Sequence, residues 1–169
     1  MINEKMETAF NAQINREFFS AYLYMSMSAN MQEIGLAGFS NWLRVQAQEE
    51  VFHATAMFDY VLQRGGKVKL QTIDTPKHQW DNVLKVFEET LAHEELVTGW
   101  INELAEVADE LKDRASAKFL QWFIAEQVEE EATASDLVAK LKLINLNGDA
   151  LFALDKELGA RVFVAPVIQ

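Results

Sequence analysis

The stretch QAQEEVFHATAMFDY, residues 46–60, has the spacing of a buried helix face, yet Glu50 and His53 interrupt that face. Apolar side chains three and four positions apart form one stripe of a helix, and such a stripe normally packs into a core. A carboxylate and an imidazole one turn apart suit iron, manganese or zinc better than magnesium or calcium. The stretch therefore predicts a core helix with two possible metal ligands on its buried face.

Four long stretches of the chain carry this helical periodicity, and none shows the alternation or the β-branched clusters typical of a sheet. We therefore expect an all-α fold. The four helices are expected to run from about Asn3 to Glu33, from about Gly38 to Arg64, from about Asp81 to Glu110 and from about Ser116 to Ile144.

The lengths of the connections predict the topology. Only a few residues join the first helix to the second and the third to the fourth, so each pair should form an antiparallel hairpin. The middle connection, residues 65–80, could span about 50 Å when extended, whereas a helix of about 28 residues is about 42 Å long. The sequence therefore predicts a four-helix bundle, about 3–144, with one long crossover.

A short fifth helix is expected over about 148–158, with Asp149 as its N-cap and Gly159 as its stop. A helix of this length is marginal by itself in water, so it should pack against the bundle or against another subunit. An apolar tail, residues 161–169, follows it. At this length the whole chain, residues 1–169, fits one domain.

Composition excludes several classes of function. The formal net charge of −11 argues against nucleic acid or an anionic membrane as a partner. The chain has no cysteine, so any metal must be held by oxygen and nitrogen ligands. The start of the chain does not resemble a secretory signal, and no apolar run approaches the length of a membrane span. We expect a cytoplasmic protein.

Residues that can bind metals interrupt all four expected core seams at one depth. Glu17 and Glu50 lie about 18 and about 15 residues from the turn near Gly35, and residues 94 and 127–130 lie at similar separations from the turn near Lys112, so the depths differ by only about 5 Å. Six side chains should meet at one level of the bundle: Glu17, Glu50, His53, Glu94, Gln127 and Glu130.

Four carboxylates gathered in an apolar core would repel one another, and each would carry a desolvation cost of several kcal/mol. One buried Glu or His would be read as a hydrogen-bonded core group, but four interrupted seams favour two bound divalent cations. The run EQVEEE beside them could be a solvated face. Since it crowds like charges on one helix, we expect a third cation site there, formed by Glu49, Glu126, Glu129 and the shared Glu130.

The segments AQEEVFHA, HEEL, FLQWFIAEQVEEE and LDKEL, in this order, closely resemble the non-haem bacterial and archaeal ferritins over essentially the whole chain. The resemblance implies a ferritin-like fold with a ferroxidase centre that holds one iron on Glu17, Glu50 and His53, and the other on Glu50, Glu94 and Glu130, with Gln127 close by. It also matches Glu49, Glu126, Glu129 and Glu130 to the third iron site of the family. It matches Tyr24 and Trp122 to aromatic residues beside the centre that are proposed to supply electrons.

The resemblance further implies a homo-oligomeric shell of 24 subunits, in which dioxygen or hydrogen peroxide oxidises ferrous iron and the product is stored as ferric oxyhydroxide. Haem is not expected, because Val51 stands where bacterioferritins carry a haem-ligating Met. Two alternatives remain: a soluble di-iron oxygenase or peroxidase without mineral storage, and a structural bundle without redox metal. The apolar tail departs from the usual polar tails of the family, and it either packs under a neighbouring subunit or alters the four-fold opening.

Overall fold

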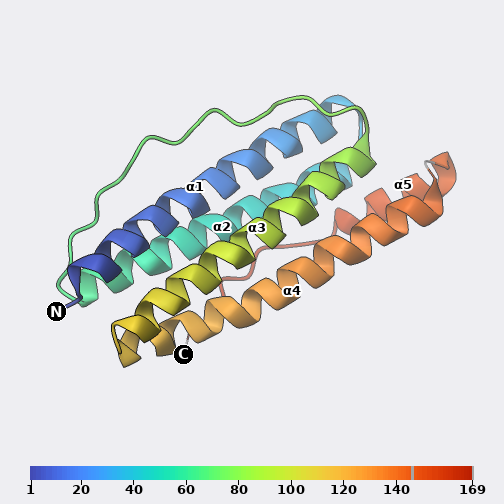
Figure 1. Ribbon diagram of the computed structural model, residues 1–169. Coiled ribbons are helices and arrows are strands. Elements are labelled where there is room, and N and C mark those ends of the chain that lie inside the picture. The colour runs from blue at the N-terminus through green and yellow to red at the C-terminus, as the bar shows by residue number, and fades with distance from the viewer. Residues whose placement is uncertain (146, 169) are drawn as a thin grey trace.

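The computed structural model describes residues 1–145 and 147–168, which contain five helices and no strand (Figure 1). The helices are α1 (Glu4–Glu33), α2 (Ala37–Gln63), α3 (Val83–Glu110), α4 (Arg114–Ile144) and α5 (Gly148–Leu158). The predicted all-α fold is confirmed, and the expected helix ends agree with these bounds to within about two residues. None of the described helices is both long enough and apolar enough to span a membrane.

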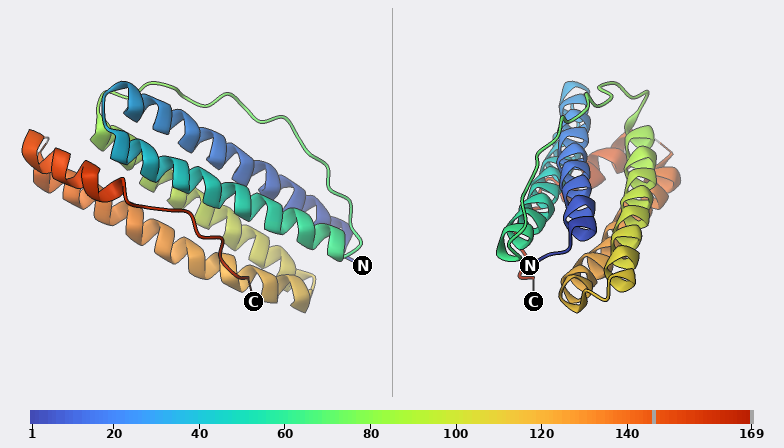
Figure 2. Two further views of the ribbon diagram at one scale, coloured as in Figure 1. Left: turned by 180° about the vertical axis from the view of Figure 1, so that it is seen from behind. Right: turned by 60° about the vertical axis from the view of Figure 1, so that its left-hand side comes forward.

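The helices form two antiparallel hairpins, α1 with α2 and α3 with α4, as the short connections predict (Figures 1 and 2). The long crossover between α2 and α3 runs the length of the bundle along α1. Hydrogen bonds attach it near both ends of α1: Asn11 Nδ2 donates to the carbonyl of Lys67 at 2.9 Å, and Ser26 Oγ donates to that of Lys77 at 2.6 Å. The predicted topology is therefore confirmed.

The short helix α5 covers the N-terminus of α2. Asp155 Oδ1 accepts hydrogen bonds from the amides of Gly38 at 2.8 Å and Phe39 at 3.0 Å. Leu36, the N-cap of α2, supplies no side-chain acceptor for these amides, so α5 provides the cap that the local sequence lacks. The close approach requires glycine, because a Cβ on Gly38 would lie 1.6 Å from the carbonyl oxygen of Asp155.

The predicted N-cap of α5 is wrong. Asn147, not Asp149, precedes the helix, and its side-chain oxygen accepts a hydrogen bond from the amide of Ala150 at 3.1 Å. Asp149 lies inside the first turn instead. There its negative charge is still favourable, because the N-terminal end of a helix carries a partial positive charge.

After α5 the chain turns back along the side of the bundle formed by α2 and α4 (Figure 2). Asn41 on α2 donates to the carbonyl of Arg161 at 2.9 Å, and Ile168 packs against the far end of the core. Residues 161–168 of the apolar tail thus pack on their own bundle; residue 169 lies outside the described part of the chain. The sequence-based expectation placed the tail under a neighbouring subunit or at the four-fold opening, and it did not include packing on its own bundle.

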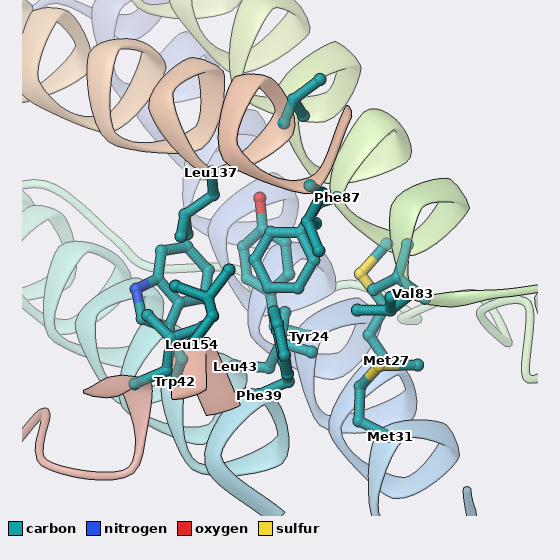
Figure 3. Packing of buried hydrophobic residues seen from close by; sticks show 14 of the residues in the cluster. Tyr24, Met27, Met31, Phe39, Trp42, Leu43, Val83, Phe87, Leu137 and Leu154 are labelled. Atoms are coloured by element: carbon teal, nitrogen blue, oxygen red, sulfur yellow. The ribbon is translucent and has the colours of Figure 1, made fainter. Parts of the chain in front are cut away.

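The core consists of two apolar clusters with a polar layer between them. One lies at the α5 end and contains Tyr24, Phe39, Trp42, Phe87 and Leu137 (Figure 3). The other lies at the opposite end and contains Phe10, Ile14, Met57, Ile101, Leu120 and Phe123. On every long helix the predicted ligand residues fall between the positions that contribute to the two clusters. The two clusters therefore fix the four helices on either side of the polar layer.

Candidate metal centre

All four long helices contribute side chains to the polar layer, and the six residues predicted to meet there are all buried. Glu17 comes from α1, Glu50 and His53 from α2, Glu94 from α3, and Gln127 and Glu130 from α4. Ligand atoms of Glu17, Glu50 and His53 lie within 4.8 Å of one another, and so do those of His53, Glu126 and Glu130. The layer therefore contains two groups of three possible metal ligands that share His53.

Three atoms of the first group have no hydrogen-bond partner among the described residues: Glu17 Oε2, Glu50 Oε2 and His53 Nε2. A buried acceptor without a partner costs roughly 1–3 kcal/mol, and more if it is charged. Native proteins rarely leave such atoms unpaired unless an ion or water binds there. Two carboxylate oxygens and an imidazole nitrogen, buried and close together, fit a transition-metal ion by both charge and ligand type.

Burial and mutual repulsion shape the electrostatics of the layer. Burial raises the pKa of Glu17 well above the usual value for a carboxyl, and the charge of Glu50 raises it further. The pKa of Glu50 is raised in the same way by burial, then by Glu94 and Glu130. Burial raises the pKa of Glu130 to about 8, with Glu94 contributing repulsion. These carboxyls therefore favour the protonated form unless a cation compensates their charge.

Two glutamines hold carboxylates of the layer, one within its own helix and the other also across to α4. Gln13 Nε2 donates to Glu17 Oε1 at 2.7 Å on α1. On α2, Gln46 Nε2 donates to Glu130 Oε2 at 2.7 Å and lies 3.5 Å from Glu50 Oε1. The sequence analysis assigned neither glutamine a role. Since each stands four residues before a ligand glutamate, the Gln-x-x-x-Glu spacing on one helix face was the signal that could have found both.

Glu94 is held from two sides. Its side chain accepts hydrogen bonds from the hydroxyl of Tyr24 and, at 3.3 Å, from Gln127 Nε2. Gln127 also lines a groove of about 550 Å³ between α3 and α4, together with Thr98 and Glu131. Gln127 therefore lies between the buried carboxylate and a groove that opens to the surface.

The two aromatic residues matched by resemblance both border the layer. Figure 3 shows Tyr24 rising from the apolar cluster with its hydroxyl directed away from the other labelled rings. Burial and the charge of Glu94 raise the pKa of Tyr24 well above its usual value, so the phenol stays protonated. On the other side, the Trp122 ring lies 5.5 Å from the His53 ring, centroid to centroid, at an angle of 71°.

The residues expected to form a third site are brought together only in part. Glu126 and Glu130 lie near each other and near His53. Glu129 is exposed, and Glu49 forms an ion pair at 2.6 Å with Arg161 from the tail. Neither of these two glutamates joins a group of three close metal ligands within the described part of the chain. The sequence analysis gave no role to Arg161, because nothing local indicates that it reaches α2.

Comparison with known proteins identifies the family of the chain. A family model described as "Ferritin-like domain" matches residues 7–144. The bacterial non-heme ferritin of Bacteroides fragilis (strain 638R) is 44% identical over 162 residues, which cover 95% of this chain and 100% of the relative. The corresponding protein of Staphylococcus aureus (strain USA300) is 36% identical over 163 residues, 96% of this chain and 98% of the relative.

Solved structures agree with the sequence relatives. An Archaeoglobus fulgidus ferritin engineered into a closed form superimposes with a TM-score of 0.96 at 54% identity, covering 97% of this chain and 100% of that chain. The open-pore ferritin of the same archaeon gives a TM-score of 0.94 at 55% identity, covering 95% and 98% respectively. Fold and sequence therefore point to the same family.

Proposed function

The chain belongs to the non-haem bacterial and archaeal ferritins, and we propose that it oxidises ferrous iron at the buried carboxylate layer and stores the ferric product as an oxyhydroxide mineral. Dioxygen or hydrogen peroxide would serve as the oxidant. The observation that carries this proposal is the convergence of three orphaned atoms, Glu17 Oε2, Glu50 Oε2 and His53 Nε2, inside an apolar bundle.

In this proposal iron is a substrate that passes through two neighbouring positions. Glu17, Glu50 and His53 would hold one ferrous ion, and Glu50, Glu94 and Glu130 would hold the other. Each ion gives up one electron, and dioxygen takes up two electrons and two protons to become hydrogen peroxide. Glu50 contacts both ions and so sets their separation, which makes it the residue on which joint oxidation depends most.

The neutral Gln127 has a different role from the carboxylates. Its amide donates to Glu94 and brings no negative charge, so it would bind a ferric ion more weakly than a glutamate would. We propose that this favours movement of the product away from the centre. Tyr24 would hold Glu94 in place through its hydroxyl. A role for Tyr24 and Trp122 in supplying electrons stays a prediction and is no part of this two-electron step.

The third cation site stays a proposal, with Glu49, Glu126, Glu129 and Glu130 as its ligands. Only part of this set is gathered in the described structure, so binding there would require the Glu49 side chain to leave Arg161. Iron is the metal expected at all three sites, and we propose that the protein carries no haem. A cytoplasmic location and a single domain over residues 1–169 likewise stay predictions.

Assembly into a shell of 24 subunits is supported by apolar side chains left uncovered near α5. Phe152 on α5 is 71% exposed, and Leu143 near the end of α4 is 88% exposed. Exposed apolar side chains mark a contact surface where they gather into a patch. We propose that α5 packs against neighbouring subunits there, as it does in the family.

The centre is tested by replacing Glu50 with Ala and following ferrous oxidation by stopped-flow absorbance. We expect rapid oxidation to be abolished, because both iron positions lose a ligand. Glu103→Ala, which removes an exposed carboxylate on α3, is the matched control and should oxidise iron at the normal rate. Near-normal rates in Glu50→Ala would refute the assignment of the centre.

Storage is tested separately, by loading the apoprotein aerobically with a few hundred ferrous ions per presumed shell and measuring particle mass and soluble ferric iron. For chains of 19.2 kDa, 24 × 19.2 kDa gives ~460 kDa. A particle of this mass that keeps ferric iron in solution supports storage. A dimer that oxidises only about two irons per chain and precipitates the rest would favour the oxygenase or peroxidase alternative.

A further inference from the structure

The guanidinium of Arg161 is fixed on α2 by three separate contacts. Its Nη2 pairs with Glu49 Oε2 at 2.6 Å. Its Nη1 donates to Gln46 Oε1 at 3.0 Å and to the carbonyl of Trp42 at 3.2 Å. The group also lies over the Trp42 ring, 4.5 Å from the centroid. An arginine that uses both prongs of its fork and stacks on an aromatic ring is held in one orientation.

These contacts connect the tail to the carboxylate layer through one residue. Gln46 accepts from Arg161 with its amide oxygen, and with its amide nitrogen it donates to Glu130. Glu130 is both a ligand of the proposed two-iron centre and the shared ligand of the proposed third site. Asn41 holds the backbone of Arg161 in place. The guanidinium therefore lies at the edge of the third site, on the side of Glu49.

A third metal ion and Arg161 place opposing demands on Glu49. The ion needs the Glu49 carboxylate turned toward Glu126 and Glu130, whereas the ion pair holds it against the tail. A metal ion and a guanidinium are both positive, so they would repel each other if both approached Glu49. The side chains of Arg161 and Glu49 are only 24% and 20% exposed, which limits screening by solvent. The two cations therefore favour different orientations of this carboxylate, because the ion pair holds Glu49 Oε2 against the tail.

We propose that Arg161 is a tethered counter-ion that competes with the third metal ion for Glu49 and thereby limits how long that ion stays. This inference rests on the third site of the proposed function and adds the residue that controls its occupancy. Linkage makes the effect reciprocal. If the docked tail weakens metal binding by some factor, metal binding weakens docking of the tail by the same factor.

The competition is tested by titrating the full-length apoprotein with Zn²⁺, a redox-inert probe, in a calorimeter. Arg161→Gln removes the competitor, and we expect the third ion to bind at least ~5-fold more tightly, the lower end of typical couplings between sites. Arg161→Lys keeps the charge but loses the fork, so its affinity should lie between the two. Arg114→Gln removes the same charge from a remote exposed position on α4 and should change nothing. Equal or weaker binding of the third ion in Arg161→Gln would overturn the proposal.

Two further measurements distinguish a failure of the Arg161 proposal from a failure of the proposed function. Glu49→Gln should lose the third ion and keep the first two; if it binds as many ions as the natural chain, the third site is wrong and this inference fails with it, while the two-iron centre stands. In the natural chain, hydrogen exchange of residues 161–168 should speed up when Zn²⁺ fills the third site. Exchange that slows or stays constant contradicts release of the tail.

Discussion

Metal binding to the carboxylate layer should release protons in a number that depends on pH. Glu130, with a pKa raised to about 8, is ~97% protonated at pH 6.5 and ~24% protonated at pH 8.5. A divalent ion binds the ionised carboxylate, so Glu130 alone should release about one proton at pH 6.5 and about 0.2 at pH 8.5. Burial raises the pKa of Glu17 and Glu50 as well, which adds to the count at the lower pH.

The sign of the pH dependence follows from the direction of these shifts. A carboxyl whose pKa is raised holds its proton over the range between the ordinary value near 4.5 and its own raised value. Each proton that a metal ion must displace lowers the apparent affinity by about tenfold per pH unit of acidification. We therefore expect affinity for the first two ions to fall steeply as the pH falls below about 8, the pKa of Glu130.

Calorimetric titration with Zn²⁺ in two buffers of different ionisation enthalpy counts the protons directly. Glu130→Gln has no proton to lose at this position. The number of protons released on metal binding should therefore fall by about one at pH 6.5 and by only about 0.2 at pH 8.5. Glu103→Gln on the exposed face of α3 should match the natural chain at both pH values. A proton count of zero at pH 6.5, or the same count in Glu130→Gln, would refute the electrostatic argument.

Four other substitutions test three separate parts of the structure. Tyr24→Phe removes the hydroxyl that donates to Glu94; ferrous oxidation should slow while stability falls by only ~1–2 kcal/mol, and an unchanged rate in stopped-flow absorbance would show that this contact does not position Glu94. Gly38→Ala should lower the free energy of unfolding by about 2 kcal/mol or more, because the added Cβ meets the backbone of α5. Gly99→Ala lies in open space within α3 and should raise the free energy of unfolding by up to ~1 kcal/mol. Equal denaturation midpoints for the two variants would contradict the packing of α5. Phe152→Asp should yield particles smaller than the full shell in analytical ultracentrifugation, and intact shells would place the subunit contact elsewhere.

The bundle and the depth of its polar layer could be predicted from the sequence because both depend on regular spacing. Helical periodicity locates each seam, and counting residues from the turns places Glu17, Glu50 and Glu94 at one level. The N-cap of α5 was predicted wrongly because asparagine and aspartate both favour this position, and only the first residue of the helix shows that Asn147 occupies it.

The contacts made by α5 and the tail could not be predicted in this way. Asp155 caps α2 from 117 positions away, and Arg161 reaches Glu49 across 112 positions. No periodic pattern records such pairs, because each depends on where the chain turns after the bundle is complete. Composition alone describes the tail as apolar. The residue that anchors it, Arg161, is the single charged side chain of residues 161–169.

The layer can be nearly neutral in two ways, which supports the proposal that it binds iron and also gives it up. Without a cation, the raised pKa values keep protons on Glu17, Glu50 and Glu130. With two divalent ions, the metal charge replaces those protons. Loss of iron to the mineral therefore need not leave several bare charges in the core, a state that would cost several kcal/mol per ion. The two apolar clusters fix the four helices on either side of the layer, so we expect exchange between protons and iron to require movement of side chains rather than of the fold.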